Sequence, residues 1–297
     1  MEGQVAMGET ALIERRILVK GVSTLYYEMG SGPVLLLVHG NFANAENWKR
    51  TMEDFMSTHR VVALALPGYG GTSPIGDVTP GRLASFIVSF LDALSIDEVI
   101  AVGHSSGGLI VAELALAHPE RVTRLVMTDS AGLGRAVHPS FVVTAMLPRP
   151  VTEAMIAAML APGGEVLRAS MVSMLFRRPW RVTPREWIEQ IRNTESETLL
   201  RTSYEAIRGA NGLSGQRWLV GDRLKDLAMP TLVIWGANDE VFPVRQARAA
   251  VKKIPKARLK VLNVAGHAAY LDYHRQFVDA LGPFVRDESV EPAAVGT

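Results

Sequence analysis

The stretch Gly103-His104-Ser105-Ser106-Gly107 decides the fold, because it sets a serine between two glycines where a strand meets a helix. Glu98–Val102 before it is typical of a short strand, and Ser106–His118 after it is typical of a helix that ends at Pro119. A G-x-S-x-G sequence in this context forms a sharp turn that tolerates only small residues two positions from the serine. The turn predicts an exposed Ser105 hydroxyl above a sheet, at a helix N-terminus that favours developing negative charge.

A serine hydroxyl needs a base to become a nucleophile, and the base needs a carboxylate that orients it. His267 follows Gly266 in a loop after the last predicted strand. Asp239 ends the stretch Trp235-Gly-Ala-Asn-Asp239, in the loop after the preceding strand. We therefore predict Ser105 as the nucleophile, His267 as the base and Asp239 as the acid.

Three other side chains compete for these roles. Asp129 follows the predicted strand Val122–Thr128 and is the alternative acid, although we favour its interpretation as a helix or turn cap in Thr128-Asp-Ser. His39 and His104 each precede a tight turn. We expect these two histidines to support their turns rather than to act as bases.

An attacked carbonyl oxygen becomes negatively charged and needs two backbone N–H donors. One donor is predicted at Ser106, the residue after the nucleophile. The other is expected in His39-Gly40-Asn41-Phe42, where Gly40 lets the backbone turn close to the serine. Asn41 is the first choice for this second donor, and Phe42 is the second choice.

Strands and helices alternate at short spacing through most of the chain, which predicts an α/β fold with a mostly parallel sheet and helices on both faces. An antiparallel hairpin is expected first, formed by Leu12–Val19 and Ser23–Tyr27. Further strands are predicted at Val34–Val38, Val61–Leu66, Glu98–Val102, Val122–Thr128, Thr231–Trp235 and Leu259–Leu262. Helices are predicted at Glu46–Ser57, Arg82–Leu94, Ser106–His118, Val244–Ile254 and Ala269–Val285.

The alternation stops between about Gly134 and Gly221, where the sequence has helical character and several prolines divide it into short segments. This stretch contains no clear buried strand. We therefore expect residues 134–221 to form a helical insertion, and residues 1–133 and 222–297 to form one core domain.

The composition excludes several classes of function. Thirty-one Lys and Arg against thirty Asp and Glu leave no basic excess for nucleic-acid binding. The absence of cysteine excludes a disulfide framework, a thiolate nucleophile and a cysteine-ligated metal. The longest apolar stretches are too short to span a bilayer, and Met1 to Glu14 is unlike a signal peptide. We expect a cytoplasmic monomer or homodimer that binds a small molecule and neither membrane nor nucleic acid.

Six short motifs occur in order along the chain: Val38-His-Gly-Asn41, Asn47-Trp48, Leu66-Pro-Gly-Tyr-Gly70, the Ser105 turn, Trp235-Gly-Ala-Asn-Asp239 and Gly266-His267. In this combination they resemble the α/β-hydrolase-fold enzymes, over a match from about Leu12 to Arg286. The resemblance implies that family's fold and its triad order of Ser105, Asp239 and His267. It also implies that the insertion is a cap domain and that no cofactor or metal is needed.

Differences between this chain and particular enzymes of this fold reduce the number of activities to consider. Ser105 stands where epoxide hydrolases and haloalkane dehalogenases have an aspartate, which argues against both activities. Asp129-Ser-Ala-Gly-Leu-Gly134 looks like the segment that leads into the cap of carbon–carbon bond hydrolases acting on ring-cleavage products. Those enzymes commonly carry Trp after the catalytic histidine, whereas Ala268 follows His267 here.

The insertion has eleven arginines, seven glutamates and no lysine or aspartate, a local excess of four positive charges, and it is rich in Met and Trp. One interpretation is a helical subdomain that packs its Met and Trp internally and leaves its arginines in solvent. The other is an apolar pocket between insertion and core, in which Arg177 or Arg178 steers an acidic or carbonyl-rich substrate. Phe42 and Trp48 are further predicted substrate contacts.

The sequence thus predicts a serine hydrolase that cleaves a carboxylic ester, lactone or thioester of a small to medium hydrophobic substrate through an acyl-enzyme. Two alternatives remain open. One is hydrolysis of the carbon–carbon bond of a vinylogous diketone, and the other is a non-hydrolytic lyase or a ligand-binding protein of the same fold.

Overall fold

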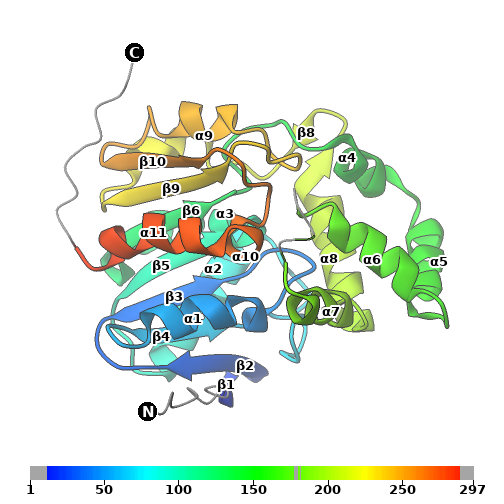
Figure 1. The fold of residues 1–297 in the computed structure, drawn as a ribbon, viewed down its shortest axis with the longest axis horizontal. Coiled ribbons are helices and arrows are strands. Elements are labelled where there is room, and N and C mark those ends of the chain that lie inside the picture. The colour runs from blue at the N-terminus through cyan, green and yellow to red at the C-terminus, as the bar shows by residue number, and fades with distance from the viewer. Residues whose placement is uncertain (1–11, 177–179, 181, 288–297) are drawn as a thin grey trace, which may run out of the picture.

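An eight-stranded sheet forms the centre of the computed structural model, which describes residues 12–176, 180 and 182–287 (Figure 1). Its strands are β1 (Glu14–Val19), β2 (Val22–Met29), β3 (Val34–Val38), β4 (Arg60–Leu64), β5 (Val99–His104), β6 (Val122–Thr128), β9 (Thr231–Gly236) and β10 (Ala257–Leu262). They lie in the order β1-β2-β4-β3-β5-β6-β9-β10. β1 pairs antiparallel with β2 and β2 with β4, whereas every pair from β4 to β10 is parallel. The predicted mostly parallel α/β sheet is confirmed.

β3 shows how the sequence specifies a strand covered on both faces. Leu35 and Leu37 pack into one hydrophobic cluster, and Leu36 and Val38 pack into the cluster on the opposite face. All four side chains are fully buried. Because successive side chains of a strand point to opposite faces, a strand buried on both sides is apolar at every position. The apolar run Val34–Val38 therefore predicts this strand with its correct bounds.

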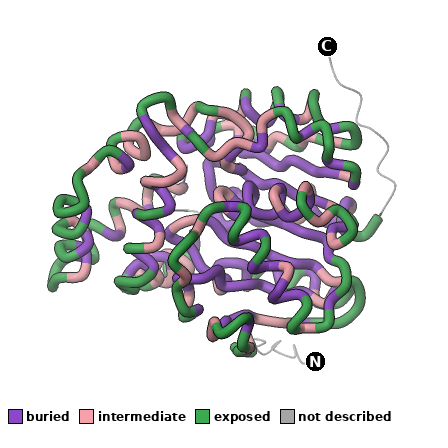
Figure 2. Tube along the Cα trace, turned by 180° about the vertical axis from the view of Figure 1, so that it is seen from behind, coloured by how far each residue is buried: buried purple, intermediate pink, exposed green. Residues whose placement is uncertain are grey.

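Helices cover both faces of the sheet. The helices on one face are α1 (Lys49–Phe55), α10 (Ala269–Asp272) and α11 (His274–Val285). Those on the other are α2 (Pro80–Ala93), α3 (Ser106–Ala117) and α9 (Arg245–Ala250). Short 3-10 helices cover Ala45–Trp48, Pro119–Arg121 and Gly221–Asp226. Figure 2 shows buried residues concentrated in the strands and on the inward sides of these helices.

The helix predicted at Ala269–Val285 is interrupted at Tyr273, so the prediction of one continuous helix is wrong. His274 Nδ1 lies 2.8 Å from the carbonyl oxygen of Tyr270. In an unbroken α-helix this carbonyl would accept the backbone N–H of residue 274. The His274 ring bonds to that carbonyl instead, and the chain turns there to begin α11.

The chain between β6 and β9 leaves the sheet and returns to it, and residues 134–221 of this segment are called the helical insertion below. Its helices lie beside one end of the sheet (Figure 1). They are α4 (Pro139–Met146), α5 (Arg149–Leu160), α6 (Glu165–Ser173), α7 (Pro184–Asn193) and α8 (Glu197–Ala210). The sequence did not predict the two-residue strands β7 (Asn211–Gly212) and β8 (Gly215–Gln216), which pair with each other and not with the central sheet.

Over the described ranges, no single helix combines the length and the hydropathy needed to cross a membrane. α4 and α5 meet those criteria only when they are taken as a pair, and the two helices are bent by 114° where they meet.

Candidate active site

Ser105 lies at the turn between β5 and α3 with φ 56° and ψ −122°. A positive φ is costly for a residue with a side chain and persists only where the surroundings enforce it. Here the backbone N–H of Ser105 donates to the carbonyl of Thr128 at 3.0 Å. The Ser105 carbonyl accepts hydrogen bonds from the N–H groups of Gly108 and Ala131, each at 3.0 Å. These bonds hold Ser105 at the carboxyl end of β5.

The two glycines of the motif allow this turn because the backbone packs closely around it. A Cβ atom on Gly103 would lie 2.3 Å from the carbonyl oxygen of Gly107. A Cβ atom on Gly107 would lie 2.4 Å from the carbonyl oxygens of both Val38 and His39. Any side chain at either position would displace the loop after β3 or the first turn of α3, which accounts for the small residues that the motif requires.

The structure brings together the three side chains predicted as nucleophile, base and acid. His267 Nε2 lies 3.0 Å from Ser105 Oγ, and His267 Nδ1 lies 3.0 Å from Asp239 Oδ2. The other carboxylate oxygen, Asp239 Oδ1, accepts the backbone N–H groups of Val241 at 2.8 Å and Phe242 at 3.0 Å. A carboxylate bound in this way holds the imidazole with its Nδ1 proton toward Asp239, which leaves Nε2 free to accept a proton from the serine.

The imidazole of His267 is enclosed, with only 3% of the residue exposed. The Phe242 ring packs edge-on against it with centroids 5.4 Å apart, and the His104 ring lies 4.8 Å away on another side. A charge that develops on this imidazole is therefore poorly solvated, and the Asp239 carboxylate is the group placed to stabilise it.

His39 and His104 bond to backbone groups around the site. His39 Nδ1 donates to the carbonyl of Gly40 at 2.8 Å, while its Nε2 accepts the N–H of Leu66 at 3.1 Å. His104 Nε2 donates to the carbonyl of His267 at 2.7 Å. Burial lowers the pKa of His39 to about 4. Burial, and then the neighbouring His267, hold the pKa of His104 well below its usual range, so both rings are neutral at pH 7.

Asp129 hydrogen-bonds to Gly236 and Thr128, whereas the carboxylate bonded to the imidazole is that of Asp239. Its Oδ1 accepts the N–H of Gly236 at 2.8 Å, and the Thr128 hydroxyl donates to its Oδ2 at 3.3 Å. Asp129 therefore bonds across to the backbone at the end of β9, so its interpretation as a helix or turn cap is corrected. Burial, and secondly the charge of Asp239, raise the pKa of Asp129 well above its usual range.

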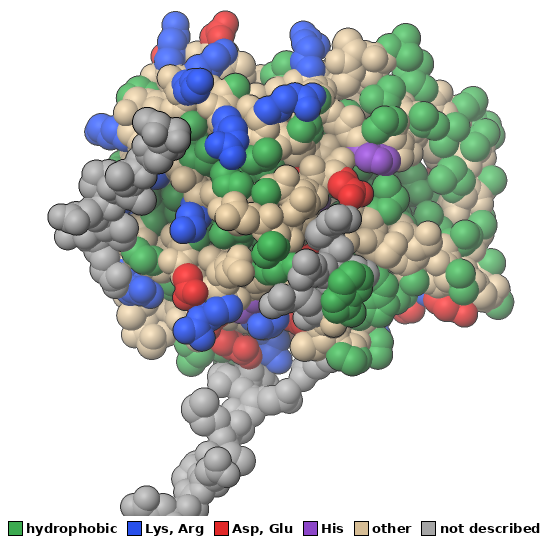
Figure 3. All heavy atoms as spheres, turned by 45° about the horizontal axis from the view of Figure 1, so that its top comes forward, with side chains coloured by type: hydrophobic (Ala, Val, Ile, Leu, Met, Phe, Trp, Pro, Cys, Tyr) green, Lys and Arg blue, Asp and Glu red, His purple; other side chains and the backbone are tan. Residues whose placement is uncertain are grey.

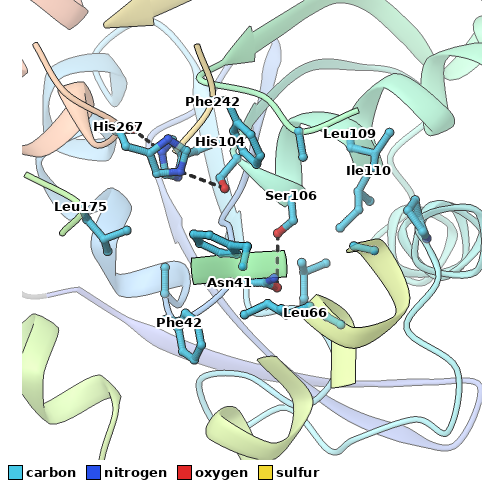
Figure 4. Close-up of a pocket in the computed structure, with 18 of the residues that line it drawn as sticks. Asn41, Phe42, Leu66, His104, Ser106, Leu109, Ile110, Leu175, Phe242 and His267 are labelled. Carbon is cyan, nitrogen blue, oxygen red and sulfur yellow. Dashed lines mark hydrogen bonds between the residues drawn. The ribbon is translucent and has the colours of Figure 1, made fainter. Parts of the chain in front are cut away.

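The loop after β3 approaches the serine, and its side chains are tied in place. Asn41 Oδ1 accepts the Tyr69 hydroxyl at 2.9 Å and the Ser106 hydroxyl at 3.4 Å (Figure 4). The N–H of Phe42 donates to Ser203 Oγ at 3.1 Å. Among the described residues, none accepts a hydrogen bond from the N–H of Asn41. Of the two choices for the second oxyanion donor, Phe42 is thus already engaged and Asn41 is not.

An apolar pocket of about 80 Å³ surrounds Ser105 and His267. Asn41, Phe42 and Ser106 line it, as do Leu109 and Ile110 of α3 and Phe242 from the loop after Asp239 (Figure 4). Sequence reasoning missed several further lining residues, which are Tyr69, Phe141, Leu175, Gln190, Gln216 and Trp218. Tyr69 stood in Leu66-Pro-Gly-Tyr-Gly70, a motif that contributed to the resemblance but whose side chains had no predicted role.

Two sets of predicted substrate contacts do not lie at this pocket. Trp48 is fully buried, and its ring packs 4.4 Å from that of Tyr270 and 6.2 Å from that of Phe277. It belongs to the core between α1 and α11 and does not line the pocket, so its prediction as a substrate contact is corrected. Arg177 and Arg178 lie outside the described residues. In the part of the chain that the structure describes, no group of three His, Asp or Glu side chains is arranged to hold a metal ion.

Known proteins are similar to this chain in both sequence and structure. Residues 33–273 match the family described as alpha/beta hydrolase fold. The chain is 30% identical over 265 residues to the dihydrolipoyllysine-residue acetyltransferase component of the acetoin cleaving system of Cupriavidus necator, a match that covers 87% of this chain but 65% of that protein. It is 28% identical over 286 residues to 2-hydroxymuconate semialdehyde hydrolase of Pseudomonas sp. strain CF600, and this match covers 93% and 94% of the two chains. The structure of a thermophilic esterase from Thermogutta terrifontis is similar with a TM-score of 0.76 at 21% identity, over 94% of this chain and all of that one.

Proposed function

The chain belongs to the α/β-hydrolase fold family, and from this premise we propose that it is a serine hydrolase cleaving a carboxylic ester, lactone or thioester of a small to medium hydrophobic substrate. The observation that carries the proposal is the position of the His267 ring, 3.0 Å from both Ser105 Oγ and Asp239 Oδ2. A hydroxyl, an imidazole and a carboxylate in this order form the arrangement that activates serine for attack on a carbonyl.

In the proposed reaction Ser105 Oγ attacks the carbonyl carbon while His267 Nε2 accepts the hydroxyl proton. Asp239 keeps the imidazole in the required tautomer and stabilises its cation. The imidazolium then protonates the leaving group, and an acyl-enzyme on Ser105 remains. Water attacks this ester with His267 again as the base, which releases the acid and restores the serine. Each step uses groups of the chain and water alone.

The tetrahedral intermediate needs donors for its oxyanion. We assign them to the backbone N–H groups of Asn41 and Ser106. The N–H of Ser106 lies at the start of α3, where the helix dipole also favours a negative charge. The Asn41 side chain bonds to both Tyr69 and Ser106, and these contacts support its position in the loop.

The pocket supports the proposed hydrophobic character of the substrate, because its walls are mostly aliphatic and aromatic. Residues of the helical insertion, among them Leu175 and Trp218, form part of these walls. We therefore assign residues 134–221 as a cap domain over a core of residues 1–133 and 222–297. A pocket between cap and core suits a hydrophobic small molecule that is largely buried when bound.

A second candidate is hydrolysis of a carbon–carbon bond in a vinylogous diketone. It is favoured by the 28% identity to a 2-hydroxymuconate semialdehyde hydrolase over 94% of that enzyme. Ala268, which follows His267 and lines the pocket, stands where the resemblance leads us to expect Trp for such a substrate. This difference makes the ester the first choice.

Initial rates on p-nitrophenyl esters of increasing acyl length test the proposal, with Ser105→Ala as the control. The proposal predicts activity with an optimum at one chain length and its loss in the control. A folded protein that hydrolyses no ester but cleaves a dienone substrate would replace it with the carbon–carbon activity.

A further inference from the structure

A second cavity, which the proposed mechanism does not use, is lined mainly by residues of the helical insertion. Its volume is about 380 Å³, against about 80 Å³ for the pocket beside Ser105. Sites for small-molecule ligands usually measure about 300–1,000 Å³. The pocket at the serine lies below this range and the second cavity lies within it, so the second cavity offers room for a part of the substrate distant from the carbonyl.

The lining of this cavity is apolar and adaptable. α5 contributes Met155, Ala158 and Met159, which share one face of the helix, and α6 contributes Leu167 and Met171. None of the described residues that line the cavity carries a charge. Methionine side chains are unbranched and adjust to irregular apolar ligands. These walls fit a flexible hydrocarbon chain, and their polar side chains are the uncharged hydroxyls of Ser140, Thr144, Ser170 and Tyr204.

A thin apolar wall separates this cavity from the pocket at Ser105. Phe42, Phe141, Leu175 and Ile207 line both spaces. Figure 4 shows Phe42 and Leu175 on one side of the catalytic pocket, away from Leu109 and Ile110. A chain that leaves the carbonyl at Ser105 on that side reaches Phe42 and Leu175, which also border the second cavity.

The second cavity also reaches the surface of the molecule. Leu167 and Met174 line it, and they are 48% and 46% exposed. Further exposed large apolar side chains among the described residues of the insertion are Val143, Met146, Val151, Val166, Trp180, Ile188 and Leu213. In Figure 3 hydrophobic side chains gather on the side of the molecule that the insertion forms. An apolar mouth of this kind admits a hydrocarbon chain from outside.

We propose that the cavity lined by α4, α5, α6 and α8 binds the distal part of an unbranched aliphatic acyl chain whose carbonyl lies at Ser105. The chain passes the Phe42 and Leu175 side chains, which move aside to join the two spaces. This inference rests on the proposed ester hydrolysis and names its substrate class, esters of medium to long fatty acids.

Two neighbouring alanines of α5 provide a matched test. Ala157 and Ala158 are both exposed, but only Ala158 lines the cavity. The ratio of kcat/KM for p-nitrophenyl dodecanoate to that for p-nitrophenyl acetate is measured in the wild type, Ala158→Trp and Ala157→Trp. We expect this ratio to fall about tenfold in Ala158→Trp and to keep its wild-type value in Ala157→Trp. An equal ratio in all three proteins, or a wild type that prefers acetate, would overturn the proposal.

Binding without turnover separates this inference from the proposed function. Dodecanoate is titrated by calorimetry into Ser105→Ala and into Ser105→Ala combined with Ala158→Trp. We expect saturable one-to-one binding that the tryptophan weakens about tenfold. If the wild type hydrolyses no ester and this binding is still found, the proposed function fails and the cavity assignment stands. If esters are hydrolysed but dodecanoate binds equally to both variants or to neither, the cavity assignment alone fails.

Discussion

The backbone N–H of Phe42 donates to Ser203 Oγ at 3.1 Å, which ties the loop after β3 to helix α8 of the insertion. The Ser203 hydroxyl donates onward to the Tyr69 hydroxyl at 3.4 Å, and Tyr69 donates to Asn41 Oδ1 at 2.9 Å. Ser203 is fully buried. The position of the loop that we assign to the oxyanion therefore depends on a buried hydrogen-bond network with a member in the insertion.

Removal of the Ser203 hydroxyl is expected to affect both stability and turnover. Ser203→Ala leaves the Phe42 N–H without its acceptor, and an unsatisfied buried group costs roughly 1–3 kcal/mol. We expect the free energy of unfolding in urea to fall by this amount and kcat/KM on esters to fall about tenfold. Ser85→Ala, at an exposed serine of α2, is the control. Ser203→Ala with wild-type stability and wild-type kinetics would show that the network does not hold the loop.

The two buried aspartates are expected to differ in their effect on turnover. Asp239→Asn removes the carboxylate that orients His267, and we expect kcat to fall on the order of 10³-fold to 10⁴-fold. In Asp129→Asn the amide oxygen can still accept the N–H of Gly236, so we expect kcat within about tenfold of the wild type. Steady-state kinetics of both variants decide the assignment. A larger loss in Asp129→Asn than in Asp239→Asn would transfer the role of the acid to Asp129.

His39 is expected to make the fold acid-sensitive. Its pKa is about 4 in the folded chain and 6.5 without burial, so the unfolded chain binds more protons between these values. The contribution of His39 to the free energy of unfolding is therefore fully present above pH 6.5. This contribution falls by about 3 kcal/mol as the pH decreases to 4. Denaturation of the wild type and of His39→Gln between pH 4 and 7 measures how the slope of the free energy of unfolding against pH differs between the two proteins.

The ring itself provides a check that does not require a folded variant. An NMR titration of the wild type is expected to show His39 still neutral at pH 5. A midpoint near 6.5 for this ring would contradict the predicted acid sensitivity.

Trp48 is expected to matter for stability and not for substrate binding. Its ring lies against Tyr270 and Phe277 in the core, so Trp48→Ala leaves a large cavity and should cost roughly 3–5 kcal/mol. Trp48→Phe keeps an aromatic ring there, and we expect its KM on esters to equal that of the wild type. A several-fold rise of KM in Trp48→Phe would restore the predicted substrate contact.

Local sequence patterns predict much of the sheet, and they predict that Ser105, Asp239 and His267 lie close together. A strand buried on both faces is apolar throughout, so the run Val34–Val38 predicts β3 with its observed bounds. The predicted bounds Val122–Thr128 also match those of β6, although Thr123 of this strand is exposed. Gly103 and Gly107 report backbone packing that no other residue permits. The loops after β9 and β10 lie at the same edge of a parallel sheet, so Asp239 and His267 follow from their places after strands.

The roles of individual aromatic residues depend on packing that the sequence does not display. Trp48, Met52 and Phe55 are spaced as one face of a helical segment, and this spacing is the signal that marks Trp48 as core. Tyr69 and Ser203 are 134 residues apart, and only the folding of the insertion against the core brings them together. No local pattern predicts such a contact.

The methionines of the insertion show where composition alone is ambiguous. By composition they fit either internal packing or a pocket wall, and in the structure some line a cavity and others do not. Met155, Met159, Met171 and Met174 line the second cavity, whereas Met146 does not line it and is 51% exposed. Which side of a short helix faces a cavity depends on how the helices cross, and this is set by the whole insertion.

Labelling of the active serine tests the central claim most directly. The protein is treated with a fluorophosphonate, which reacts covalently with activated serines, and the modified peptide is identified by mass spectrometry. The account predicts one adduct, on Ser105, that is lost in Ser105→Ala and strongly slowed in His267→Ala. An unmodified wild type, or an adduct on another residue that persists in Ser105→Ala, would contradict it.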